Sequence, residues 1–180
     1  GLTAPSDPNG WYCTVPSPVA TVELELDWAL NPQRSANIWE IHVVAQHLSP
    51  KCDGDAVEVV RDDGTRIATY RECRSWSFER SLHMGGEQRR LVNEVLSRTS
   101  VYDGDAFQVV WWAVDVDTLG ANERCGRRRG RSVAPITRGF VRHDNWGEGV
   151  HAEENDLLEC STAELIAKQL RIGYTIQVHE

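Results

Sequence analysis

The chain has 180 residues, of which 41% are hydrophobic and 26% are charged, and its formal net charge at pH 7 is -8. This composition lies close to the globular average and excludes a fibrous or largely disordered protein. The negative charge argues against a nucleic-acid partner, because affinity for phosphates comes mainly from cationic side chains. Since no apolar run approaches the roughly 18 residues of a membrane helix, we also expect no membrane span.

The first 18 residues are expected to form an irregular N-terminal arm. Asn9-Gly10 is a turn signal, and four prolines surround it: Pro5, Pro8, Pro16 and Pro18. The chain starts without an initiator Met or the pattern of a signal peptide, so we expect it to be processed or trimmed. Residues 19–180 have the length of a single β-rich domain with one core.

Two strands are predicted directly after the arm. Residues 21–28, TVELELDW, alternate between polar and apolar side chains, with Trp28 on the apolar face. The same period of two resumes in residues 38–48, with Trp39 on the apolar face. His42 and His47 fall on opposite faces of this second strand. We therefore expect them to be surface or core residues and not joint metal ligands.

A β-hairpin is predicted between Cys52 and Cys73. Two short apolar runs, residues 56–60 and 66–70, flank Asp62-Asp63-Gly64, a sequence that suits a three-residue hairpin loop. Folding at this loop places the two cysteines nearly opposite each other. Opposed positions in an antiparallel pair lie close enough for a disulfide bond.

The remaining cysteines favour a second disulfide bond. No pair has the spacing of a zinc site or a redox motif. Cys125 with Cys160 is the natural second pair, which leaves Cys13 free, buried or intermolecular, although Cys13 could also displace another partner. Disulfide bonds form in oxidising compartments, so we expect a secreted, extracellular or particle-surface protein. Five buried thiols in a cytosolic protein are the alternative.

The middle of the chain is predicted to contain a short strand, a helix and a central strand. Residues 75–79, SWSFE, read as a short strand with Trp76 and Phe78 inward. The helix is expected over residues 87–98, where Leu91, Val92, Val95 and Leu96 form a stripe at helical spacing. Residues 106–116 are apolar on both faces, which is typical of a covered central strand.

The last third of the chain predicts two further strands and a second helix. Residues 121–132 read as a charged loop, and residues 133–142 as a strand. A capping box at Ser161 predicts a short helix to about Arg171, before a last strand over residues 172–178. The fold class is therefore α+β, mainly β: an antiparallel β-sandwich or open barrel of about seven or eight strands with two short helices.

The octapeptide DGDAVEVV, residues 53–60, returns as DGDAFQVV, residues 103–110. Gly and Asp are the residues that tight turns select, so both copies are interpreted as turns that start a strand. A calcium site needs six to eight oxygen ligands, and two carboxylates in each copy supply too few.

Residues 143–156 contain the densest group of candidate catalytic or metal-binding side chains. His143, Asp144, His151 and Glu153 could act as acid-base groups, and His143, His151 and Glu153 could hold a divalent metal with a water at an open position. Their spacing matches no established signature, and polar loops collect such residues for solvation alone. We expect no cofactor, with a divalent metal as the alternative.

Basic and aromatic residues supply the candidate binding positions. An arginine cluster in an otherwise acidic chain could dock an acidic partner or an anionic glycan, and an exposed Trp beside polar groups suits a protein or sugar interface. The candidate binding residues are Arg127, Arg128, Arg129, Arg131 and Trp146.

The sequence contains no signature of an established enzyme class. The favoured hypothesis is an exported, non-enzymatic module that binds other protein chains or assembles with itself, as a subunit of a cell-surface or virion structure. A secreted metal-dependent hydrolase or lyase using residues 143–156 is the first alternative. A carbohydrate-binding β-domain is the second.

Overall fold

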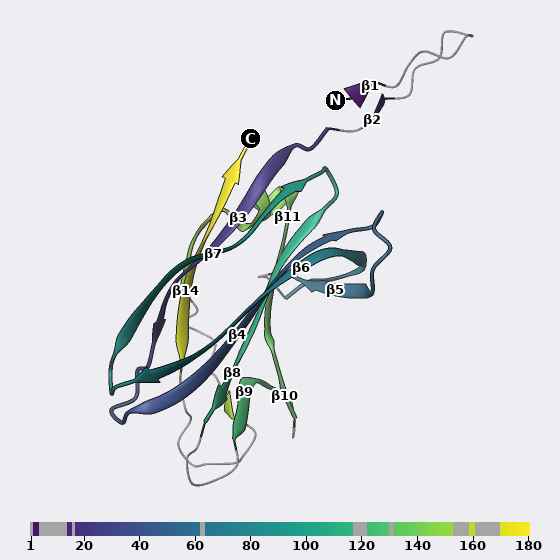
Figure 1. Cartoon of the computed structure of the whole chain (residues 1–180). Coiled ribbons are helices and arrows are strands. Elements are labelled where there is room, and N and C mark those ends of the chain that lie inside the picture. Colours follow the sequence, from purple (N-terminus) through teal and green to yellow (C-terminus); the bar gives the residue numbers. More distant parts are fainter. Residues whose placement is uncertain are drawn as a thin grey trace, which may run out of the picture.

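The computed structural model describes residues 2–3, 14–15, 17–61, 64–116, 122–129, 132–152, 159–160 and 170–180. These residues are mostly antiparallel β-strand, arranged in two main sheets (Figure 1). The long strands β3 (Ala20–Leu30) and β4 (Asn37–Ser49) alternate over most of their length between buried side chains that face the other sheet and side chains that face outward. The alternation read from the sequence is therefore the direct cause of the two-layer architecture.

The larger sheet has eight strands among the described residues. Its main order is β10-β9-β8-β4-β6-β5, while β11 pairs with β8 and β13 pairs with β9. The bounds are β4 (Asn37–Ser49), β5 (Ala56–Val60), β6 (Arg66–Met84), β8 (Ala106–Asp115), β9 (Glu123–Arg129), β10 (Ser132–Ala134), β11 (Ile136–Val141) and β13 (Glu159–Cys160).

The smaller sheet has four strands among the described residues, in the order β12-β14-β3-β7. Its pairs are all antiparallel, and β7 and β12 form its two edges. The bounds are β3 (Ala20–Leu30), β7 (Arg89–Val101), β12 (Gly149–Ala152) and β14 (Arg171–His179). A separate two-stranded sheet pairs β1 (Leu2–Thr3) with β2 (Thr14–Val15).

One core joins the two main sheets into a β-sandwich-like body. The larger sheet contributes Trp39 and Trp111, and the smaller sheet contributes Leu24 and Tyr174, all of which are fully buried. Burying such large apolar side chains from both layers is what holds the layers together. The predicted central strand is confirmed, because β8 pairs with β4 on one side and with β9 and β11 on the other.

A second, smaller core lies where β5 folds back over the larger sheet. Leu48, Val59, Tyr70 and Ala106 form this cluster. Gly139 permits the close approach, since a Cβ on it would lie 2.4 Å from a Val59 methyl carbon. This end of the larger sheet therefore curls toward closure, while the rest stays open.

The helix predicted over residues 87–98 is wrong. This segment is the edge strand β7, whose register against β3 shifts twice. Val92 and Leu96 pack against the core while Leu91 and Val95 face solvent, as the two-residue alternation of a strand requires. Residues four apart share a face in a strand as they do in a helix, so two adjacent apolar residues repeated after four positions fit either structure.

Other predicted features also differ from the structure. The two short strands predicted on either side of Cys73 are parts of one 19-residue strand, β6. The charged loop over residues 121–132 contains β9 and the start of β10, and the strand predicted over 133–142 is divided at Pro135, which cannot donate a ladder hydrogen bond. Trp28 faces outward, because β3 shifts register between Leu26 and Trp28.

The only helical segment among the described residues is a 3-10 helix, η1 (Arg142–Gly147). The helix predicted from Ser161 lies almost wholly outside the described residues, and β14 already begins at Arg171. Most of the predicted arm, residues 1–18, also lies outside them. None of the helical structure described is long and apolar enough to cross a membrane.

Both predicted disulfide bonds are present. Cys52 and Cys73 are bonded with their Cα atoms 5.2 Å apart, and Cys125 and Cys160 with theirs 4.0 Å apart. The second pair occupies directly opposed positions of β9 and β13. Cys13 lies outside the described residues, so its pairing stays open.

Candidate functional site

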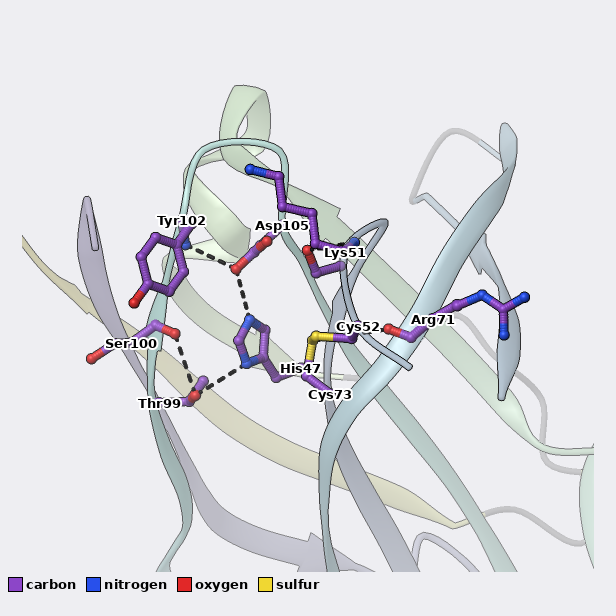
Figure 2. The surroundings of a disulfide bond; sticks show 10 residues. His47, Lys51, Cys52, Arg71, Cys73, Thr99, Ser100, Tyr102 and Asp105 are labelled. Atoms are coloured by element: carbon purple, nitrogen blue, oxygen red, sulfur yellow. Dashed lines mark hydrogen bonds and ion pairs between the residues drawn. A yellow bond between two sulfur atoms is a disulfide. The ribbon is translucent and has the colours of Figure 1, made fainter. Parts of the chain in front are cut away.

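A pocket of about 310 Å³ lies at the end of the molecule where β7 turns into β8. The Cys52–Cys73 disulfide bond forms part of its wall, and His47 and Asp105 form another part (Figure 2). Tyr102 is 39% exposed at the same place. The pocket also includes Ser49, Lys51 and Asp103.

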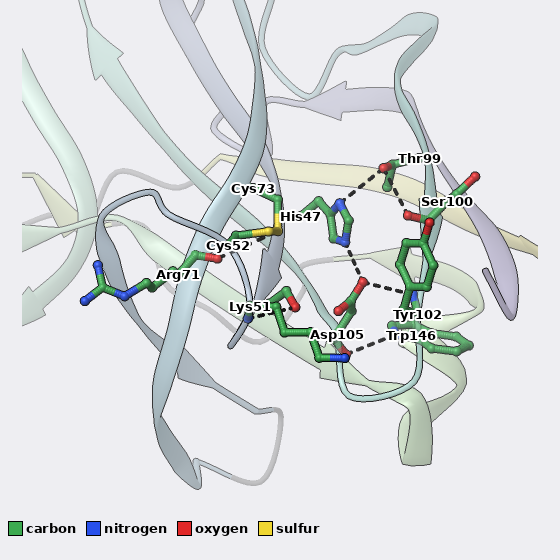
Figure 3. A network of polar contacts seen from close by, with 11 residues as sticks. His47, Lys51, Cys52, Arg71, Cys73, Thr99, Ser100, Tyr102, Asp105 and Trp146 are labelled. Carbon is green, nitrogen blue, oxygen red and sulfur yellow. Dashed lines mark hydrogen bonds and ion pairs between the residues drawn. A yellow bond between two sulfur atoms is a disulfide. The ribbon is translucent and has the colours of Figure 1, made fainter. Parts of the chain in front are cut away.

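His47 connects the two sheets at this end. Its ring lies between Asp105, with Nε2 2.8 Å from the carboxylate, and Thr99 of β7, whose hydroxyl oxygen is 3.3 Å from Nδ1 (Figure 3). Because an ionised carboxylate only accepts, the Nε2–H donates to Asp105. The Thr99 hydroxyl donates to the Ser100 carbonyl at 3.5 Å, and the same hydroxyl oxygen pairs with His47 Nδ1.

Asp105 is positioned by the tight turn at residues 102–105. Gly104 has a φ of +88°, a conformation that glycine adopts without strain, and the Asp105 N–H donates to the Tyr102 carbonyl at 3.0 Å. The Asp105 carboxylate in turn accepts from the Tyr102 N–H at 2.9 Å. The indole N–H of Trp146 donates to the Asp105 carbonyl at 3.3 Å, so η1 also holds the turn (Figure 3).

The repeated DGD sequence was predicted to be a turn in both copies. The second copy is a hydrogen-bonded turn, whereas the first copy has a bend at Gly54. Each copy directly precedes a strand, β5 in the first case and β8 in the second. The copies differ in what their last aspartate does: Asp55 accepts from the Glu72 N–H through its carbonyl, whereas Asp105 contributes a buried carboxylate to the His47 network.

The Asp105 carboxylate is held in its ionised form. Burial by itself tends to raise the pKa of Asp105, but hydrogen bonds from His47, the Tyr102 N–H and Ser49 outweigh burial and lower it. The order hydroxyl, imidazole, carboxylate resembles the relay of acyl-transfer enzymes. Here, however, the imidazole and carboxylate side chains are only 12% and 5% exposed. The network is therefore arranged first to join the two sheets.

We expect the free energy of unfolding to fall as the pH is lowered below about 4. The pKa of Asp105 is lower in the folded state, so the unfolded chain binds more protons in this range, and the stabilisation disappears as the pH falls through the folded pKa. Urea unfolding over a pH series will measure this slope. Asp105→Asn should flatten it, while Asp103→Asn, at an exposed carboxylate in the same turn, should leave it unchanged.

The structure places the candidate catalytic and metal-binding side chains of residues 143–156 in different surroundings. Asp144 and His151 line a second pocket of about 220 Å³, whereas His143 is exposed and Glu153 lies outside the described residues. The Asp144 carboxylate accepts from Arg61 at 2.7 Å, and although burial tends to raise its pKa, the Arg61 and Val141 hydrogen bonds lower it.

His151 is also engaged within the protein. Its Nε2–H donates to the Gly147 carbonyl at 2.6 Å, and its ring stacks on Tyr174 at 4.9 Å between centroids. With Nε2 acting as a donor, only Nδ1 could bind a metal in this arrangement. The catalytic and metal hypotheses for this loop stay predictions.

The candidate binding residues lie in different surroundings. Trp146 is only 2% exposed, so its side chain offers no surface to a partner in this conformation. Arg127 is half-buried on β9. The structure does not describe the side chains of Arg128 and Arg129, and Arg131 lies outside the described residues. The proposed role of the arginine cluster stays a prediction.

The structure brings together an apolar surface that sequence reasoning missed. It lies on the outward face of the four-stranded sheet, where Leu91 pairs with Trp28, Trp28 with Gly173, and Gly173 with Ala152. The next outward row begins with Val95 on one edge and ends with Val150 on the other. We call this set the outer apolar surface: Trp28, Leu91, Val95, Val150 and Ala152.

The outer apolar surface is open to solvent at both sheet edges. Leu91 is 71% exposed, Val95 53% and Val150 78%. In the middle, Trp28 is half-buried because it lies over Gly173, where a Cβ would approach the indole to within 2.2 Å, and Arg89 stacks on it at 4.3 Å. No local sequence signal joins these residues, since they come from three strands, β3, β7 and β12.

Comparison with family models, with curated proteins and with solved structures finds no match to this chain.

Proposed function

We propose that this protein is an exported, disulfide-stabilised module that binds another protein chain through the outer apolar surface. The observation that carries the proposal is the exposure of Leu91, Val95 and Val150 on one outward sheet face. Large apolar side chains gathered on a monomer surface mark interaction sites more often than solvated faces. The aromatic ring of Trp28 at the centre supplies the kind of anchor on which binding energy concentrates.

Binding through the face of the sheet is favoured over strand addition at its edge. Of the two edge strands, β12 has only 4 residues, and the longer edge β7 has two register shifts that interrupt a regular ladder. Asn93 has a φ of +48°, which turns its backbone groups away from the pattern that an added strand requires. Such bulges hinder edge-to-edge pairing. The partner is therefore expected to present side chains and not a strand.

Export is proposed because two disulfide bonds persist only where the surroundings are oxidising. The charges beside the surface indicate the chemistry of the partner. Glu25 and Asp27 lie on β3 between the apolar edges, and Asp27 accepts from the Thr175 hydroxyl at 2.7 Å. An apolar patch flanked by basic residues would complement this arrangement. A second copy of the chain is the self-assembly form of the same proposal.

Substituting Leu91→Lys and Val95→Lys together should weaken partner binding at least about tenfold, since hot-spot residues each contribute more than about 1 kcal/mol. Both side chains are exposed, so the free energy of unfolding should change little. Binding is measured by surface plasmon resonance with partner isolated from the extracellular fraction, and self-association by sedimentation velocity over a concentration series.

The matched control is Ser100→Lys, which adds the same charge on the same strand at an exposed position. It should bind as the wild type does. Equal binding by the double variant and the wild type would contradict the proposal. A wild-type protein that stays monomeric and captures the same proteins as the double variant would contradict it as well.

A further inference from the structure

The outward face of the larger sheet carries a group of side chains with the chemistry of a metal site. Glu40 and His42 alternate along β4 with the buried Trp39, Ile41 and Val43, so both point outward. Glu79 of β6 is directly paired with His42. One ligand atom from each of Glu40, His42 and Glu79 lies within 4.8 Å of the other two.

The separations are close to those that a metal ion would impose. His42 Nε2 lies 2.6 Å from a Glu40 oxygen, and Nδ1 lies 3.8 Å from a Glu79 oxygen. Zinc bonds of about 2.0–2.2 Å in tetrahedral geometry place donor atoms about 3.4 Å apart. Glu40 would move outward by less than about 1 Å, and Glu79, whose side chain is 65% exposed, is free to swing toward the same ring nitrogen.

The imidazole is held in place by its neighbour on the other side. Trp112 of β8 is paired with His42, and the two rings stack with centroids 4.9 Å apart and planes within 6°. Arg124 lies over the Trp112 ring at 5.1 Å, which fixes the indole in turn. A ligand ring that is already oriented loses little side-chain entropy when it binds an ion.

The charges of the cluster also suit a divalent ion. Two carboxylates and a neutral imidazole carry two negative charges, which one divalent cation neutralises. A mixture of nitrogen and oxygen donors favours zinc and similar transition metals over calcium and magnesium, which prefer oxygen alone.

We propose that Glu40, His42 and Glu79 form a binding site for a divalent transition metal, with zinc as the probe. Three protein ligands leave a fourth position open to solvent, where a water or a donor from another molecule completes the coordination. This site lies on the opposite sheet from the outer apolar surface, and it stands or falls independently of the proposed function.

Isothermal titration of zinc chloride into tag-free Cys13→Ser protein tests the site, because that background removes the fifth cysteine as a zinc ligand. We expect one zinc ion per chain with micromolar affinity. His42→Gln and Glu79→Gln should each weaken binding at least about tenfold, since even the loss of a group that only orients a ligand costs that much. Circular dichroism and the melting temperature establish that the variants are folded.

Two controls separate this site from others. Glu94→Gln removes a comparably exposed carboxylate, which lies on β7 and pairs with Arg80 of β6 at 2.7 Å, and it should leave zinc binding unchanged. His151→Gln should also leave it unchanged, whereas loss of binding in this variant alone would place the metal near residues 143–156 and overturn the proposal. Zinc affinity that persists in both His42→Gln and Glu79→Gln, or no binding at millimolar zinc, would overturn it as well.

Discussion

Replacing Cys125 and Cys160 by alanine is expected to lower the free energy of unfolding by about 4 kcal/mol. The bridge closes a segment with a sequence separation of 35, and the loss of loop entropy in the unfolded chain accounts for this magnitude. Both sulfur-bearing side chains belong to the main core, with Cys125 fully buried and Cys160 8% exposed. Urea unfolding of the oxidised wild type and of the double variant measures the difference.

The comparable double variant at Cys52 and Cys73 serves as the reference. Its bridge has a sequence separation of 21, which corresponds to about 3.4 kcal/mol, and its side chains are half-buried. We therefore expect the Cys125–Cys160 variant to be the less stable of the two. Equal midpoints for the wild type and the Cys125–Cys160 variant would show that the bridge does not form. A thiol titration of the unfolded, unreduced protein should find at most one free cysteine.

Asp105→Ala is expected to lower the free energy of unfolding by about 2–4 kcal/mol, because each buried donor left without an acceptor costs roughly 1–3 kcal/mol. The substitution leaves the His47 Nε2–H and the Tyr102 N–H without their acceptor at the junction of the two sheets. Unsatisfied buried donors lose their full hydration energy. Thermal or urea unfolding at neutral pH gives the difference from the wild type.

Asp103→Ala is the matched control for this prediction. Asp103 lies in the same turn, its side chain is 75% exposed, and it pairs with Arg142 at 3.1 Å. Removing an exposed charge changes stability by about 0.5 kcal/mol or less. If the two alanine variants were equally stable, the His47 network would not join the sheets. Asp105→Asn should fall between Asp105→Ala and the wild type, because its amide oxygen can still accept one hydrogen bond.

Sequence patterns predicted strands well where one face is buried and the pairing is regular. The alternation in residues 21–28 and 38–48 corresponds to β3 and β4, and the alternation in residues 172–178 corresponds to β14. The pattern failed at β7, where Leu91 and Val95 face outward and Val92 and Leu96 face inward. Apolar residues at i, i+1, i+4 and i+5 form one stripe on a helix but occupy both faces of a strand, so their spacing alone could not separate the two structures.

For the candidate sites too, the sequence identified individual residues but not their contacts with distant segments. The sequence singled out Asp144 and His151, which do line one pocket, but it could not show that Arg61 already pairs with Asp144. His47 was expected to be a surface or satisfied core residue, and the structure satisfies it through Asp105, which is 58 residues away in the sequence. A contact over that separation requires β4 and β8 to be paired in the correct register first.

The sequence by itself determined that this protein is mainly β, and it predicted that Cys52 pairs with Cys73. These features depend on local alternation and on spacing within one hairpin. The sequence favoured Cys125 with Cys160 but left Cys13 as a possible partner, so the tertiary structure decided that pair. Only the tertiary structure decided which side chains meet across strands. The His47–Asp105 junction, the outer apolar surface and the Glu40–His42–Glu79 cluster all depend on strand register, and register is set by packing between segments far apart in the chain.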